Sequence, residues 1–129
     1  MAEIPALNQI SDEYGSKIDF VVLFWDPKSE LGKLAEKYHK NIRIVPSELK
    51  DTSEVHRIDI SGFRHILGYP FTYLVNQQKQ IIGYAAGSTV PGSFDLPDGK
   101  KLVITEKDAY DYNYKRMKQE VGELLNNRK

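Results

Sequence analysis

The sequence predicts an α/β protein, a mixed sheet flanked by helices in a single domain spanning residues 1–129. Two observations predict this class. Segments with apolar residues three to four apart alternate with short runs of β-branched and aromatic residues, and two of those runs follow one another directly around residue 80. A chain of 129 residues with 40% apolar composition is long enough to bury a core in one domain.

The first predicted element is a helix over Glu3–Tyr14, because its larger apolar residues recur three to four apart and so share one face. Gly15 ends this helix. The next segment, Ile18–Trp25, is a continuous apolar stretch rich in β-branched and aromatic residues, which predicts a strand covered on both faces. Asp26-Pro27 closes that strand.

A second helical pattern covers Ser29–Lys40, where leucine, alanine and tyrosine again fall at helical spacing. Its N-cap is Ser29 or Asp26, since both residue types accept hydrogen bonds from the free N–H groups of a first turn. A short strand is predicted over Ile42–Val45.

The middle of the chain is weakly patterned. The stretch Pro46–Ile60 is polar and has no period, which predicts a loop with a helical turn near Glu54. The segment Ser61–Leu67 predicts a short helix, and Gly68 ends it.

Two strand-like runs follow, Phe71–Val75 and Gln80–Ala85. The four residues between them suit a β-hairpin turn, so the two runs are predicted to be antiparallel. Val90–Asp98 contains Pro91, Gly92 and Pro97, with a Pro-Asp-Gly turn at residues 97–99, and predicts a loop, with a brief extended piece at Leu102–Ile104. From Asp108 onward, helical spacing predicts a terminal amphipathic helix.

Charge and hydropathy exclude two classes of partner. Eighteen basic and eighteen acidic side chains cancel, so no net field draws the chain to nucleic acid. Tyr110, Tyr112 and Tyr114 beside Lys115-Arg116 suggest a base-stacking surface, but the first and last of these tyrosines share the core-facing stripe, which favours a core role. The longest apolar run, Phe20–Trp25, is too short to cross a bilayer and the N-terminus shows no export signal, so we expect no membrane insertion.

The chain contains no cysteine. This excludes disulfides, thiolate metal sites, a Cys-x-x-Cys redox pair and a cysteine nucleophile. The three histidines, His39, His56 and His65, are too far apart for a metal-ligand spacing, and the sequence has no Gly-x-Ser-x-Gly, Gly-x-Gly-x-x-Gly or Walker motif. We therefore expect no metal, no cofactor and no catalytic residue.

Several segments, taken in order, carry a family resemblance. They are the helix Glu3–Tyr14 with the strand after it, the helix ending in Lys37-Tyr38-His39, the segment Gly68–Val75, the strand Gln80–Tyr84 with Gly87, and the terminal helix. They resemble the thioredoxin-like proteins of the redoxin and TlpA type. In that comparison Gly68–Val75 matches the family's cis-proline segment and the strand that follows it. The resemblance covers residues 3–87 and 108–125.

The resemblance implies a thioredoxin-like fold and, for the family, thiol-disulfide oxidoreduction, often in redox homeostasis or cytochrome maturation in the bacterial cell envelope. The family's second cysteine would fall immediately before Met1, and its first central strand is absent, so we expect a start truncated just after the Cys-x-x-Cys motif. Without a thiolate this chain is expected to be redox-inactive. The alternative is a non-catalytic module that binds a protein or an extended peptide. The resemblance favours the bacterial periplasm, whereas the residues themselves indicate no compartment.

The resemblance also implies a binding edge formed by Pro70, Tyr69, Trp25 and Asp26. A trans proline at a strand start is the ordinary expectation for Pro70, whereas the resemblance implies a cis bond. The other three residues have simpler interpretations as a half-buried aromatic, a helix cap and a surface aromatic.

Two further expectations concern the missing part of the family pattern. In a second alignment, residues 24–29 occupy the place of the family's Phe-Trp-x-x-Cys-x-x-Cys region, with Asp26 and Ser29 near the cysteine positions. If the first central strand is absent, Ile18–Trp25 pairs directly with Phe71–Val75, or a second chain pairs at the sheet edge and makes a homodimer.

Overall fold

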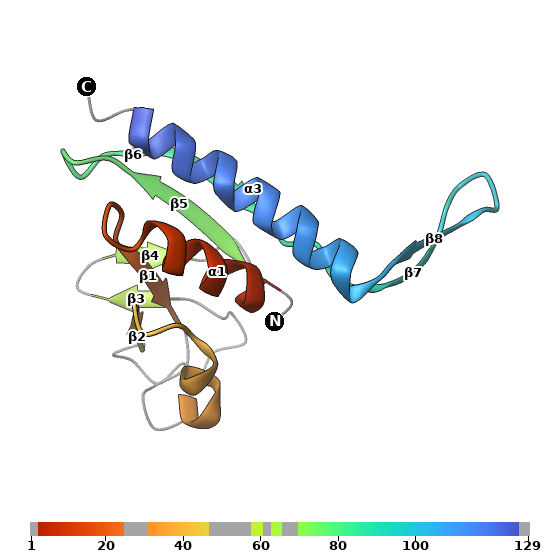
Figure 1. Cartoon of the computed structure of the whole chain (residues 1–129), viewed down its shortest axis with the longest axis horizontal. Helices are drawn as coiled ribbons and strands as arrows, with labels where there is room; N and C mark the ends of the chain where they lie inside the picture. The colour runs from red at the N-terminus through yellow and green to blue at the C-terminus, as the bar shows by residue number, and fades with distance from the viewer. Residues whose placement is uncertain (1–2, 25–30, 47–57, 61–62, 66–69, 127–129) are drawn as a thin grey trace.

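The computed structural model describes residues 3–24, 31–46, 58–60, 63–65 and 70–126 (Figure 1). Its elements, in chain order, are α1 (Ile4–Tyr14), β1 (Phe20–Leu23), the 3-10 helix η1 (Gly32–Lys37), β2 (Ile42–Val45), β3 (Ile58–Ile60), β4 (Phe63–His65), β5 (Phe71–Val75), β6 (Ile81–Ala86), β7 (Gly92–Asp95), β8 (Lys101–Ile104) and α3 (Glu106–Asn126). The chain is therefore an α/β protein, as predicted.

The core lies between the two long helices. Ala6 and Ile10 of α1 pack against Met117 and Val121 of α3, and all four are buried. Around them lie partly buried apolar and aromatic residues: Leu7, Tyr14, Ile18, Phe20, Tyr110, Tyr114 and Leu125. Both helices were predicted from their apolar spacing, and the core role predicted for Tyr110 and Tyr114 is confirmed.

Local chemistry sets the ends of these helices. Before α3, the Asp108 backbone N–H donates to Thr105 Oγ1 and the Thr105 N–H donates to Asp108 Oδ2, each at 3.0 Å, which is a reciprocal N-terminal cap. After α1 the chain turns at Gly15, where a Cβ atom would lie 2.6 Å from the Ser11 carbonyl oxygen and 2.6 Å from Asn41 Nδ2. Only glycine fits this close approach of backbone and side chain.

Strands β1 and β2 are parallel, with Phe20 opposite Ile42, and the crossover between them contains η1. The predicted strand over Ile18–Trp25 is shorter in the structure, and within the predicted helix Ser29–Lys40 the described residues form a short 3-10 helix instead of an α-helix. The strand predicted over Ile42–Val45 is confirmed.

Strands β5 and β6 form the predicted antiparallel hairpin, which the Asn76 side chain organises at its turn. The Oδ1 atom of Asn76 accepts the backbone N–H groups of Gln78 and Gln80 at 3.0 and 2.9 Å. Lys79 adopts a left-handed φ of 65° to close the turn. Strand β5 contacts α3. Within the β5–β6 hairpin, the buried Leu74 side chain lies over Gly83.

Two predictions for the middle of the chain are wrong. Residues 58–60 and 63–65 form an antiparallel pair of strands, where the sequence predicted the end of a loop and a short helix. The reason is the length of the connection: two short runs separated only by Ser61-Gly62 satisfy their backbone groups by pairing with each other. The helical turn predicted near Glu54 lies outside the described residues.

The loop predicted over Val90–Asp98 is also wrong, because residues 92–95 form β7, which pairs with β8 in an antiparallel hairpin. The proline and glycine residues lie at the ends of this hairpin and do not interrupt it. Gly99, with a φ of 83°, forms part of the tight turn, and its N–H donates to the Leu96 carbonyl oxygen at 3.0 Å. The brief extended piece predicted over Leu102–Ile104 is part of β8.

The described strands do not form the single mixed sheet that the sequence predicted. They make four two-stranded sheets, one parallel and three antiparallel. The prediction that the first strand pairs directly with Phe71–Val75 is wrong, because β1 hydrogen-bonds to β2 and β5 to β6, and no described strand joins the two pairs. Among the described helices, none is long and apolar enough to cross a membrane.

Candidate functional site

Pro70 stands exposed at the start of β5, where the sequence places the binding edge. Its carbonyl oxygen accepts a hydrogen bond of 2.8 Å from the Gly87 backbone N–H, which extends the β5–β6 ladder by one residue beyond Phe71 and Ala86. Gly87 has a φ of 82°, a left-handed conformation that turns the chain out of β6. We refer to Pro70 with the segment Gly87–Thr89 as the Pro70 edge.

Helix α3 holds the Pro70 edge in place. The Arg116 Nη1 atom donates to the Gly87 carbonyl oxygen at 2.6 Å. The buried Asn113 carboxamide pairs with both backbone groups of Thr89, accepting from its N–H and donating to its carbonyl oxygen, each at 2.9 Å. The irregular segment after β6 is thus fixed through polar contacts to a rigid helix.

The N-terminus of α1 meets the same edge. Ser88 Oγ donates to Glu3 Oε2 at 3.4 Å, and Glu3 is the residue directly before α1. The Glu3 side chain does not cap the first N–H groups of this helix. Because the N-terminal end of a helix carries a partial positive charge, the negative charge of the Glu3 carboxylate is favoured at this position. In Figure 1, the start of β5 and the N-terminal end of α1 lie close together.

The carboxyl end of β1 approaches from the other side. Phe24, which directly follows β1 and is buried, contacts the Tyr38 ring edge-to-face at a centroid distance of 5.7 Å. Burial, together with the Glu3 carboxylate, raises the pKa of Tyr38 from its usual value of 10 to about 12. The Glu3 carboxylate thus acts on Tyr38 electrostatically and accepts a hydrogen bond from Ser88 at the Pro70 edge.

Of the four residues predicted for the binding edge, the structure places Pro70. Tyr69, Trp25 and Asp26 lie outside the described residues, as does Ser29 of the second alignment. Their described neighbours are Pro70, which follows Tyr69, and Phe24, which precedes Trp25.

An exposed aromatic group adjoins Pro70, and the sequence analysis missed it. The ring of Phe71 lies 4.9 Å from that of Tyr73 and stacks on that of Tyr84 at 5.8 Å with an interplanar angle of 10°. Tyr84 is 75% exposed. Three apolar residues of the same hairpin, Val75, Ile81 and Ile82, are exposed as well. We call Phe71, Tyr73 and Tyr84 the aromatic platform. The alternation of aromatics at positions 71 and 73 was the signal that could have revealed it.

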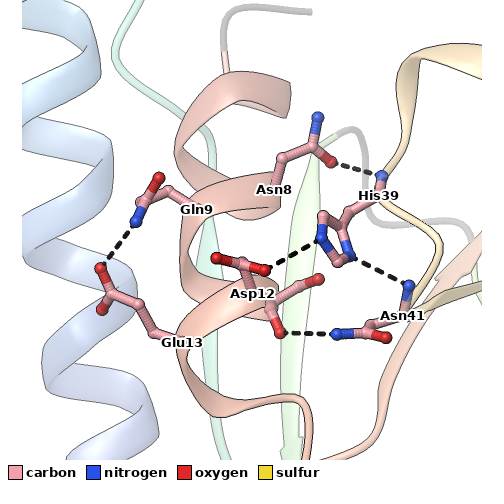
Figure 2. A network of polar contacts seen from close by, with 7 residues as sticks. Asn8, Gln9, Asp12, Glu13, His39 and Asn41 are labelled. Atoms are coloured by element: carbon pink, nitrogen blue, oxygen red, sulfur yellow. Dashed lines mark hydrogen bonds and ion pairs between the residues drawn. The ribbon is translucent and has the colours of Figure 1, made fainter.

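His39 lies in a separate polar network between α1 and the start of β2 (Figure 2). Its Nδ1 accepts the Asn41 backbone N–H at 3.1 Å, and its Nε2 lies 3.3 Å from Asp12 Oδ1. Both ring nitrogens therefore take part in contacts within the protein. The Asn8 Oδ1 atom accepts the His39 backbone N–H at 2.7 Å, so this network joins α1 to the segment before β2.

The described residues include no group of three or more acidic or histidine side chains placed to hold a metal ion. His56 lies outside the described residues, and His65 belongs to β4. Comparison with family models, with curated proteins and with solved structures finds no match for this chain. What the structure and the sequence define is an α/β protein without cysteine.

Proposed function

We propose that this chain is a thioredoxin-like domain without thiols, which binds an extended peptide or an unfolded protein segment and does not catalyse thiol-disulfide exchange. The observation that carries the proposal is the meeting of the α1 N-terminus with the Pro70 edge through Ser88 and Glu3. In the family that the sequence resembles, the redox motif precedes this helix and faces the proline. The same two structural elements adjoin here without any thiol.

Further features support this assignment. A parallel strand pair follows α1, an antiparallel pair follows Pro70, and the terminal helix α3 packs beside α1. These elements follow one another in the order that the resemblance implies, with the β3–β4 and β7–β8 hairpins between them.

The chemistry follows from the absence of cysteine. Thiol-disulfide exchange begins with attack of a thiolate on a disulfide sulfur and passes through a mixed disulfide. None of the other side chains provides such a nucleophile, and the chain contains no cysteine. An insulin-reduction assay is therefore expected to give no turnover above the blank.

The aromatic platform explains how binding would occur. Tyr84 and Phe71 form a stacked pair next to exposed Pro70, and Ile82, two positions from Tyr84 on β6, extends the apolar surface. An extended peptide pairs with a strand edge through its backbone and places alternate side chains on such a surface. Tyrosine is well suited to this role because it offers a large contact area at low conformational-entropy cost.

Binding can be tested with reduced and alkylated insulin B chain as an extended, thiol-free probe, measured by fluorescence anisotropy. We expect Tyr84→Ser to weaken binding about five- to thirtyfold, because one buried aromatic contact contributes on the order of 1–2 kcal/mol. Tyr112→Ser is the matched control, since Tyr112 is a 61% exposed tyrosine on α3. Pro70→Ala is expected to lower the affinity as well, because Pro70 belongs to the proposed binding edge.

If the wild type, Tyr84→Ser and Pro70→Ala bind the insulin B chain with equal affinity, the peptide does not bind at this surface. Insulin reduction by the wild-type chain would contradict the non-catalytic assignment independently of any binding result.

A further inference from the structure

The β7–β8 hairpin projects away from the rest of the chain, beyond the N-terminal end of α3 (Figure 1). Every residue from Val90 to Val103 is exposed. Of the other described elements, α3 is the one that the hairpin contacts appreciably, through β8. An isolated two-stranded ribbon is at best marginally stable in water, so this hairpin needs a covering surface.

The two faces of the ribbon differ in polarity. In the observed register Phe94 lies opposite Leu102, and the Leu96 N–H donates to the Lys100 carbonyl oxygen at 2.8 Å, so Phe94, Leu96 and Leu102 share one face. Their exposed fractions are 41%, 38% and 45%. We call these three residues the apolar face of the hairpin.

The opposite face is mainly polar. It presents the cross-strand pairs Ser93–Val103 and Asp95–Lys101. Val103 is the one apolar residue among these four, and it is 64% exposed. A partner that covers the hairpin by apolar contact is therefore expected on the side of Phe94, Leu96 and Leu102 only.

Charges at the two ends of the ribbon identify the kind of partner. Lys100 lies next to the turn at the tip, and Glu106 begins α3 at the base. Neither side chain forms an ion pair with any described residue. They are six positions apart, with β8 between them, a distance of roughly 20 Å at about 3.3 Å per residue.

A twofold axis that lies between two stacked apolar faces, perpendicular to the strands, brings these charges together. When two hairpins stack face to face and antiparallel, the tip of each lies over the base of the other. Lys100 of one copy then meets Glu106 of the second copy, and the symmetry forms this contact twice. A self-complementary surface of this kind is what an isologous dimer requires.

We propose that the apolar face of the β7–β8 hairpin is a self-association surface, on which a second copy of this chain docks antiparallel through Phe94, Leu96 and Leu102, with Lys100 paired to Glu106 across the twofold axis. This inference is independent of the proposed peptide binding. An interface of one ribbon face falls below about 1,200 Å², so the dimer is expected to be concentration-dependent.

The first test is sedimentation velocity of the full chain over a range from about 1 μM to 1 mM, which brackets weak dimers. The wild type should shift from monomer to dimer within this range. Leu102→Ser and Phe94→Ser should each weaken self-association at least tenfold, while the matched control Val103→Ser, on the opposite face, should not. Circular dichroism checks that each variant keeps its fold.

The second test uses charge reversal. Lys100→Glu and Glu106→Lys should each weaken self-association, because each places like charges face to face. An equimolar mixture of the two variants restores both opposite-charge contacts and should associate more tightly than either variant alone. The effect should decrease at high salt.

Three results would overturn the proposal. They are a wild type that stays monomeric throughout the range, a Val103→Ser variant as impaired as Leu102→Ser, and a charge-reversed mixture no better than its components. A monomeric wild type would mean that a different protein covers this face.

Discussion

The carboxamide of Asn113 forms two hydrogen bonds with the backbone of Thr89, accepting its N–H and donating to its carbonyl oxygen at 2.9 Å each. This side chain occupies the place that a neighbouring strand would take. It holds an irregular segment against α3, 24 residues further along the chain. The geometry of the Pro70 edge depends on it, because Gly87 and Ser88 directly precede Thr89.

Replacing Asn113 by alanine should strongly destabilise the protein. The variant Asn113→Ala loses both hydrogen bonds and leaves the backbone groups of Thr89 without these partners beside a buried position. A cost of about 2–4 kcal/mol in the free energy of unfolding is expected, measured by urea denaturation. The control is Asn126→Ala at the exposed end of α3. A loss below about 1 kcal/mol at position 113 would show that water replaces the carboxamide.

The contact between the two helices should make stability depend on pH. Hydrogen bonds from Gln9 and from the Tyr114 hydroxyl lower the pKa of Glu13 below its usual value of 4.5. A carboxyl whose pKa is lower in the folded state stabilises the fold above its unfolded pKa and loses this contribution as pH falls through the folded pKa.

Glu13→Gln removes that titration, so the decline in stability between about pH 5 and pH 3 should be shallower than in the wild type. Urea denaturation at several pH values measures the slope. Glu36→Gln, at an exposed position on η1, serves as the control. A slope for Glu13→Gln as steep as that of the wild type would assign the acid sensitivity to other groups.

Two glycines should respond to alanine in opposite directions. At Gly15 a Cβ would meet the Ser11 carbonyl oxygen and Asn41 Nδ2 at 2.6 Å each, and would displace the hydrogen bond between these two residues. Gly15→Ala should therefore lower the melting temperature. At Gly122, inside α3, a Cβ meets nothing within 4 Å, so Gly122→Ala should add about 0.5–1 kcal/mol through helix propensity. Thermal denaturation of both variants checks the signs, and the same sign for both would contradict this packing.

The core between the helices can be tested at Ile10, which is fully buried between Ala6, Met117 and Val121. Ile10→Ala should cost about 3 kcal/mol, because it removes buried methyl groups and leaves a cavity. The matched control is Ile81→Ala, at a 54% exposed position on β6, expected to change stability by less than about 1 kcal/mol. Similar losses at both positions would mean that the helices do not form the core.

The long helices and the β5–β6 hairpin could be predicted from the sequence because their determinants are local. The stripe containing Ile10 and the run Phe71–Val75 each show their period within one element. The hairpin at residues 92–104 was missed because Pro91, Gly92 and Pro97 were interpreted as marks of a loop, whereas they lie at its two ends. Strands of three or four residues carry too few side chains to show a period.

Less of the candidate site could be predicted. The position of Pro70 before a strand was evident from the sequence, and the structure confirms it. The contacts from Arg116 and Asn113 could not be foreseen, because they join residues 29 and 24 positions apart, and their residue types are equally common on exposed helix faces. The separation of β1 from β5 depends likewise on pairing between distant strands, which no local pattern encodes.

The packing of α1 against α3 has a consequence for how the chain folds. The three antiparallel strand pairs join segments close in sequence, so those ladders form by short loop closures, whereas Tyr114 and Glu13 are 101 residues apart. Closing so long a loop is entropically unfavourable, and contacts of this range slow folding. Docking of the terminal helix onto the first should therefore be the late, rate-limiting event, after which the chain gains most of its cooperativity.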